Sequence, residues 1–167
     1  MVAASEAFPA DRPSAASAIL WGGLIAGAID ITYACVFSYA RRGVPPGRIL
    51  QSVASGALGD AAFQGGTTAA ALGLLLHFII ALIWAAVYYL ASRKLRVLAS
   101  APYVCGIVYG LLIFAAMNYV VIPLSAAPFG APPPSSPAFG TGLLVHMLGI
   151  GLPIALATRR FSRGDLK

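Results

Sequence analysis

Charged side chains are scarce in this 167-residue chain: they make up 10% of it, with 11 Lys or Arg and 5 Asp or Glu. A soluble domain uses about a quarter of its residues as charges to cover its surface. Hydrophobic residues reach 59%, and the mean hydropathy is +0.85. The composition therefore excludes an ordinary soluble domain and predicts one domain embedded in a membrane.

Cysteines and catalytic signatures are equally sparse. Cys35 and Cys105 lie in apolar segments without a CxxC partner, so we expect buried thiols and no disulfide. The chain contains no nucleophile elbow, P-loop, HExxH motif or dinucleotide fingerprint. No polar segment is long enough for a soluble catalytic domain. We therefore expect no catalytic residue, no metal signature and no enzymatic activity.

The net charge of +6 is a nucleic-acid signal only until the charges are located. They lie at the ends of apolar segments, where anionic headgroups and the positive-inside rule account for them. We therefore expect the lipid bilayer as a partner and no nucleic acid.

Four apolar segments are long enough to cross a bilayer. The clearest runs from Thr67 to Ser92 without a charged side chain, and a rise of ~1.5 Å per residue carries it across a hydrocarbon core of ~30 Å. The predicted spans are residues 15–40, 67–92, 101–122 and 137–158, flanked by a flexible tail (1–14) and a basic tail (159–167). The predicted fold is all-α: a four-helix transmembrane bundle built as two helical hairpins.

Residues 47–59 have apolar side chains at helical spacing, but a helix of that length reaches only ~15 Å. We predict a short helix lying along the membrane interface after the first span. Asp60 follows it and is expected to form an outer-surface ion pair with Arg41, Arg42 or Arg48.

Small residues mark the faces where these helices can meet. Gly23 and Gly27 form one GxxxG pair, and Gly106 and Gly110 form another. Such faces allow close approach within one chain or between two copies, so a homo-oligomer through either face stays open. Pro153 is expected to kink the fourth span.

The positive-inside rule predicts the orientation. One side holds both tails and the connection between the second and third spans. It carries most of the basic residues, namely Arg12, Arg93, Lys94, Arg96, Arg159, Arg160, Arg163 and Lys167. Both termini are therefore expected in the cytoplasm.

Four polar side chains interrupt the predicted spans: Asp30, His77, Asn118 and His146. Each lies beside small residues, and helical rise puts all four between the middle and the outer side of the membrane. Lipid offers such groups no hydrogen bonds, so we expect them to form one cluster inside the bundle. The sequence around His77 (Gly73–Phe78) is echoed around His146 (Gly142–Met147), which is also what an internal repeat would produce.

This cluster leaves several interpretations open. It can be structural, with an Asp30–His77 pair that shares a proton or forms an ion pair. It can be a path or sensor for protons, ions or a small solute, because intramembrane ionisable residues mark such paths. The two histidines can also be axial ligands of one b-type haem. A metal site at Asp30, His77 and His146 fits the ligand chemistry but not a known spacing.

The pattern resembles the YagU-like small inner-membrane proteins of bacteria, which have no assigned biochemical activity. The resemblance rests on Gly23–Gly27, on His77 and the aromatic run to Tyr88, on Gly106–Pro123 with the Pro-rich loop, and on His146 and Arg159–Arg160. The chain departs from that pattern over Pro45–Gly66 and in carrying Asp30. The resemblance implies a bacterial cytoplasmic (inner) membrane and a role under acid stress.

Overall fold

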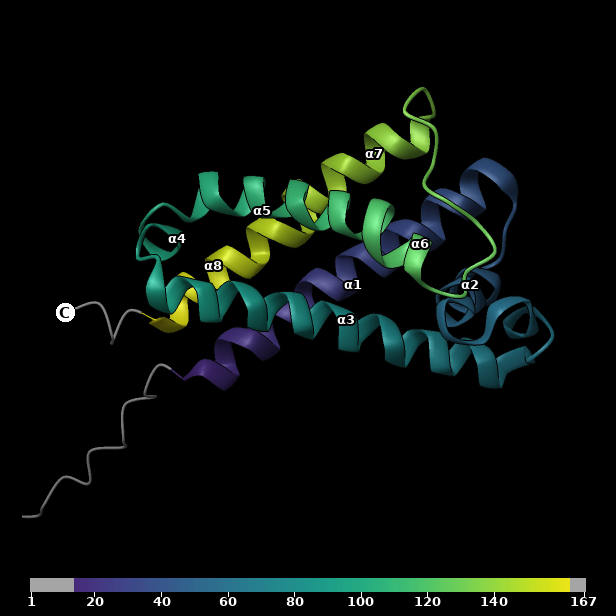
Figure 1. The fold of residues 1–167 in the computed structure, drawn as a ribbon, viewed down its shortest axis with the longest axis horizontal. Helices are drawn as coiled ribbons and strands as arrows, with labels where there is room; N and C mark the ends of the chain where they lie inside the picture. The colour runs from purple at the N-terminus through teal and green to yellow at the C-terminus, as the bar shows by residue number, and fades with distance from the viewer. Residues whose placement is uncertain (1–13, 163–167) are drawn as a thin grey trace, which may run out of the picture.

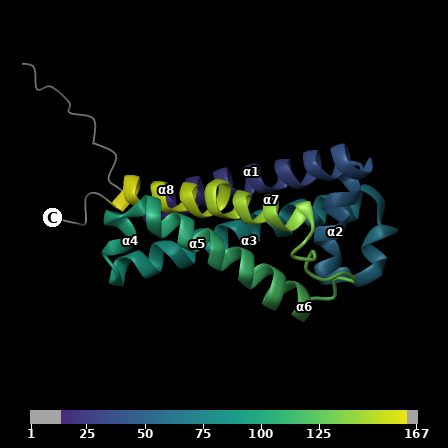
Figure 2. The same ribbon diagram turned by 90° about the horizontal axis from the view of Figure 1, so that it is seen from above.

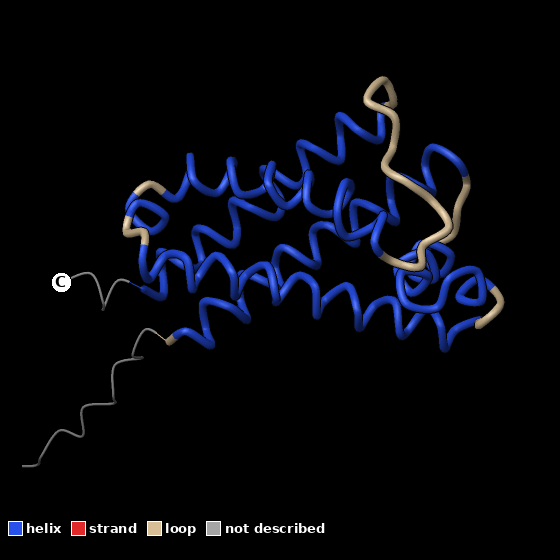
Figure 3. The backbone as a smooth tube through the Cα atoms, in the orientation of Figure 1, coloured by secondary structure: helices blue, strands red, loops and turns tan. Residues whose placement is uncertain are grey.

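The computed structural model describes residues 14–162, and this part of the chain is almost entirely helical, without a strand (Figure 3). Four stretches have the length and apolar composition to cross a membrane: Ala15–Arg42, Gly66–Lys94, Pro102–Leu124 and Pro137–Phe161. The prediction of an all-α, four-helix bundle is confirmed. Residues 1–13 and 163–167 of the expected tails lie outside the described residues.

The first two spans are single helices, α1 (Ala15–Arg42) and α3 (Gly66–Lys94). The third consists of α5 (Pro102–Ala116), the π-helical segment η2 (Met117–Val121) and α6 (Ile122–Leu124). The fourth consists of α7 (Pro137–Val145), the π-helical segment η3 (His146–Gly151) and α8 (Leu152–Ser162). Short elements in the connections are α2 (Pro46–Leu58), the 3-10 turn η1 (Gly59–Phe63) and α4 (Val97–Ser100).

The four spans run along one common direction (Figures 1 and 2). The first residue of α1 and the last of α8 lie at the same end, which we call the terminal end, together with α4. The opposite end holds α2, η1 and the 125–136 loop, and we call it the α2 end. Helix α1 packs against α3 and α8, while α5 packs against η3 and α8.

The helix ends follow local sequence signals. Ser14 caps α1 by accepting a hydrogen bond from the Ser17 N–H at 3.0 Å, and Ser136 caps α7 through the Phe139 N–H at 3.2 Å. Gly43 ends α1 in the left-handed region at φ 67°. Helix α3 begins at Gly66 without a side-chain cap.

The predicted small-residue faces are used within the chain. A Cβ at Gly23 would lie 2.8 Å from the Leu82 side chain of α3, and a Cβ at Gly27 would lie 2.9 Å from the Phe78 ring of the same helix. A Cβ at Gly110 would overlap the His146 carbonyl of η3. A Cβ at Gly106 would lie 2.9 Å from the Leu152 Cα of α8. Both GxxxG faces are therefore packed against neighbouring helices of the same chain. A homo-oligomer stays a prediction.

Aromatic side chains join α3 to α5 near the terminal end. The Tyr109 hydroxyl donates to the Trp84 carbonyl at 2.7 Å, and the Tyr88 hydroxyl donates to the Leu98 carbonyl at 2.8 Å. The rings of Tyr88 and Tyr109 pack edge to face at 4.8 Å between centroids. Together with buried Ile113 and Ile154 they form a closed core in this half of the bundle.

Helix α2 lies across the α2 end of the bundle, close to where the interfacial prediction put it (Figures 1 and 2). Its contact with α3 is closer than that prediction implied. A Cβ at Gly73 would overlap the Leu50 carbonyl, so the two backbones touch. Ala54 and Ser55 are fully buried, and the Ala126 N–H of the following loop donates to the Gly56 carbonyl at 3.0 Å.

Candidate functional site

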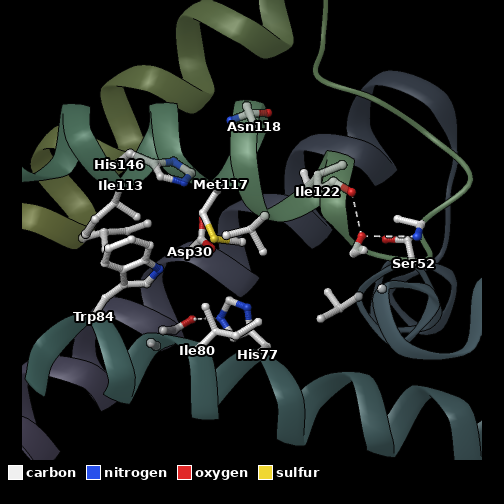
Figure 4. Close-up of a pocket in the computed structure, with 18 of the residues that line it drawn as sticks. Asp30, Ser52, His77, Ile80, Trp84, Ile113, Met117, Asn118, Ile122 and His146 are labelled. Carbon is white, nitrogen blue, oxygen red and sulfur yellow. Dashed lines mark hydrogen bonds between the residues drawn. The ribbon is translucent and has the colours of Figure 1, made fainter. Parts of the chain in front are cut away.

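A cavity of about 310 Å³ lies between the spans toward the α2 end (Figure 4). All four side chains of the predicted cluster line it: Asp30 from α1, His77 from α3, Asn118 from η2 and His146 from η3. The structure thus brings together residues that lie up to 116 positions apart (146 − 30) in the sequence. Trp84 and Ile113 close the cavity toward the terminal end, and α2 and the 125–129 loop cover its other end.

His77 is positioned by the close approach of α1 and α3. Its Nε2 lies 2.8 Å from the Gly27 carbonyl oxygen, and Gly27 has no side chain that would hold the helices apart. A carbonyl can only accept, so Nε2–H is the donor and Nδ1 is left as an acceptor in the neutral ring. The expected Asp30–His77 pair is not formed, because the Gly27 carbonyl takes the imidazole N–H instead.

His146 is bonded in the opposite sense. Its Nδ1–H donates to the Gly142 carbonyl in its own helix at 2.9 Å, which leaves Nε2 as the acceptor. The ring packs edge to face on Phe114 at 5.2 Å between centroids. His77 sits in a regular α-helix and reaches another helix, so the two similar sequences around the histidines have different local geometry.

Asn118 and His146 both lie in π-helical turns that close just before a proline. The Ile122 N–H bonds to the Met117 carbonyl before Pro123, and the Leu152 N–H bonds to the Met147 carbonyl before Pro153. Proline cannot donate to a carbonyl one turn back, so a wider turn absorbs the mismatch. The expected distortion at Pro153 therefore takes this form, and the third span continues past Pro123 to Leu124.

The same wider turns carry two of the polar side chains that line the cavity. Asn118 is 8% exposed, and its Nδ2–H donates to the Phe114 carbonyl at 2.9 Å. Its Oδ1 is therefore left for another partner. π-Helical turns recur at functional sites, and here they supply two of the four polar groups of the cavity.

Asp30 differs from the other three because its carboxylate has no hydrogen bond or ion pair within residues 14–162. Among residues 14–162, no Lys or Arg lines the cavity, so Asp30 is the one described lining residue with a formal charge when the histidines are neutral. An ionised carboxylate in such surroundings favours a positive partner.

The predicted outer-surface ion pairs are not formed among the described residues. In the described part of the chain, Asp60 is exposed and forms no ion pair with Arg41, Arg42 or Arg48. Arg48 instead donates to the Phe63 carbonyl at 3.0 Å and stacks over the Phe63 ring at 4.2 Å. Phe63 of the 3-10 turn provides both the carbonyl and the aromatic face, and the Arg48 guanidinium contacts both.

Metal and haem ligation make different demands on the site. Within residues 14–162, no three His, Cys, Asp or Glu side chains lie close enough together to hold a metal ion, so Asp30, His77 and His146 do not form such a set. Haem ligation by both histidines would require His77 to use Nδ1 or to give up its bond to Gly27.

Several lining residues carry no signal in the sequence. In the sequence, Trp84 is one of several aromatic residues that follow His77. In the structure, its indole N–H borders the cavity without a hydrogen-bond partner among the described residues. Ser52 belongs to the segment predicted to lie along the membrane interface, and Ser125 and Phe129 belong to the loop that follows the third span. In the sequence, the glycine at position 73 was the one signal that another segment could approach α3 closely here, and that segment is α2.

The fold defines a multi-pass α-helical membrane protein, and its bundle holds a mostly apolar cavity with a few polar side chains in its wall. No protein-family model, curated protein or solved structure matches the chain. The resemblance to YagU-like proteins stays an expectation from the sequence.

Proposed function

We propose that this chain is a non-enzymatic protein of the bacterial cytoplasmic membrane that admits protons or a small solute to the cavity around Asp30. The observation that carries the proposal is the Asp30 carboxylate, which lines an intramembrane cavity without a partner among residues 14–162. A purely structural acid would be expected to bond a neighbour, because an unpaired polar group in an apolar interior is costly.

The two ends of the cavity differ in a way that suits stepwise passage. The terminal end is closed by packed side chains, with Tyr88 1% and Ile113 2% exposed. The other end is covered by α2 and the 125–129 loop, which are shorter elements. Under the positive-inside rule the terminal end faces the cytoplasm, so the cavity would fill from the outer side.

Proton flux into proteoliposomes tests the proposal. A potassium diffusion potential drives protons inward, and a trapped pH dye reports their entry. We expect influx above that of protein-free vesicles, reduced at least tenfold by Asp30→Asn and lowered by His77→Ala. Asp60→Asn is the matched control, because Asp60 is exposed outside the cavity. Equal proton flux in wild type, Asp30→Asn and His77→Ala would rule out the proton path.

A bis-histidine haem is the second candidate, because both imidazoles line one cavity. His77 and His146 would be the axial ligands, and haem would supply one-electron chemistry. An absorption spectrum of the purified protein separates the candidates. A Soret band lost in both His77→Ala and His146→Ala favours haem, and a colourless preparation rules it out for that material.

A further inference from the structure

The hydrogen bonds of the cavity wall indicate which ligand it takes. His77, His146 and Asn118 each donate an N–H to a backbone carbonyl, at 2.8, 2.9 and 2.9 Å. The hydroxyls of Ser52 and Ser125 do the same, each at 2.7 Å. Five polar side chains from five different segments therefore each donate a hydrogen bond to a backbone carbonyl of the protein itself.

Most of the hydrogen-bonding groups of the cavity wall that are left for a ligand are acceptors. The free groups are the Asp30 carboxylate, Nδ1 of His77, Nε2 of His146, Oδ1 of Asn118 and the serine oxygens, of which Ser125 Oγ already accepts the Ala127 N–H at 3.2 Å. The donors left on these side chains are the second N–H of Asn118 and the indole N–H of Trp84. A ligand that satisfies this wall must donate several hydrogen bonds.

The charge of the wall points the same way. A carboxylate or phosphate ligand would meet Asp30 without any Lys or Arg to offset the repulsion. A neutral ligand would leave Asp30 unpaired in a low-dielectric site. A cationic ligand with N–H donors satisfies both the charge and the acceptors.

Size and wall chemistry favour an organic cation over a bare metal ion. A volume of about 310 Å³ holds roughly ten waters' worth of ligand. Ile80, Ile113, Met117 and Ile122 supply apolar wall, and Trp84 offers an aromatic face that attracts cations. No three metal-ligating side chains gather within the described residues. On this basis, and resting on the proposed function, we propose that the cavity binds a small protonated alkylamine.

Tryptophan fluorescence offers a direct binding assay. The chain has two tryptophans; Trp84 lines the cavity, whereas Trp21 is 57% exposed on α1. Trp21→Phe therefore leaves Trp84 as the sole reporter, in purified protein or in liposomes. The probes are n-butylammonium, 1-butanol, butyrate and butyltrimethylammonium, which vary charge and N–H donors on one butyl chain.

We expect saturable Trp84 signal change with n-butylammonium and at least tenfold weaker binding of the other three probes. Asp30→Asn should weaken n-butylammonium binding at least tenfold, while Asp60→Asn should leave it unchanged. Equal or tighter binding of butyrate, 1-butanol or butyltrimethylammonium overturns the proposal, as does unaltered binding in Asp30→Asn. The probe series needs only the Trp21→Phe protein, so it decides the matter even if Asp30→Asn fails to fold.

The two proposals fail separately. Asp30-dependent proton flux without n-butylammonium binding would overturn the alkylamine inference and leave the proton path in place. Binding of n-butylammonium without Asp30-dependent proton flux would restrict the cavity to a solute site.

Discussion

The Asp30 carboxylate gives the cavity its formal charge, and as a half-buried group without a partner in the described chain it is expected to lower stability. It lines the wall without a hydrogen bond or ion pair to any residue of the described chain. Burying an unsatisfied polar group costs about 1–3 kcal/mol, and more for a charged one. Groups that bind ligands are often less than optimal for folding, because their partner is the ligand.

Replacing Asp30 with Asn should therefore stabilise the empty protein. The amide keeps the shape and removes the charge, and we expect a gain of about 1 kcal/mol or more, or a melting temperature raised by at least ~2 °C. Thermal unfolding in detergent at neutral pH measures the shift. Asp60→Asn should leave the melting temperature unchanged because Asp60 is exposed. A lower melting temperature in Asp30→Asn would mean that the carboxylate has a stabilising partner.

Tyr109 carries a different residue-scale effect, because it fastens α5 to α3 below the cavity. Its hydroxyl donates to the Trp84 carbonyl at 2.7 Å. Tyr109→Phe should lower the free energy of unfolding by about 0.5–1.5 kcal/mol, since the carbonyl loses its extra donor and the ring contacts stay. Chemical unfolding followed by circular dichroism measures this difference. Tyr103→Phe, at a residue 61% exposed, is the control; equal losses in both would contradict the bracing role.

At the scale of elements, the contact between α2 and α3 decides whether the cavity is covered. Gly73 lets the α2 backbone touch α3, and α2 contributes Ser52, Val53 and Gly56 to the cavity wall. An interfacial helix that merely lay on the membrane would not line an internal chamber. The chamber is therefore built from the spans and from the helix that crosses their ends.

Gly73→Ala should displace α2, because the new Cβ would overlap the Leu50 carbonyl, which belongs to backbone and cannot rotate away. We expect a loss of about 1–3 kcal/mol, as for other overpacked sites. A Val53→Cys reporter should then react several-fold faster with a maleimide. Gly140→Ala is the matched control, since its Cβ would meet nothing within 4 Å. Similar stability and labelling in the two alanine variants would show that α2 is not held at Gly73.

The elements also show what the sequence could and could not predict. Long apolar runs between charged ends predicted the spans to within a few residues, because lipid demands that pattern. The rule that small residues mark helix contacts predicted that Asp30, His77, Asn118 and His146 would come together. Hydrogen-bond partners were beyond reach, since the bond from His77 to Gly27 depends on how closely two backbones approach. The π-helical turns depend on the same packing.

At the scale of the whole molecule, the spans form an up-and-down bundle in which α1 begins and α8 ends at the same end (Figure 1). The terminal end carries Arg93, Lys94, Arg96, Arg159 and Arg160, and the α2 end carries Arg41, Arg42 and Arg48. Under the positive-inside rule, this asymmetry predicts that the terminal end faces the cytoplasm. The orientation matters for function, because it decides from which side the covered end of the cavity fills.

Cysteine labelling in intact cells tests that orientation. In a background with Cys35 and Cys105 replaced by Ala, Ser135→Cys reports the α2 end and Ser100→Cys the terminal end; both serines are exposed. A membrane-impermeant maleimide should label Ser135→Cys in intact cells and Ser100→Cys only after permeabilisation, because charged reagents do not cross lipid. The reverse labelling pattern would mean the opposite orientation in the membrane, with the α2 end in the cytoplasm, and the cavity would then fill from the cytoplasm. Labelling of both sites in intact cells would mean that the two connections are not on opposite sides, and the four-span topology itself would then be wrong.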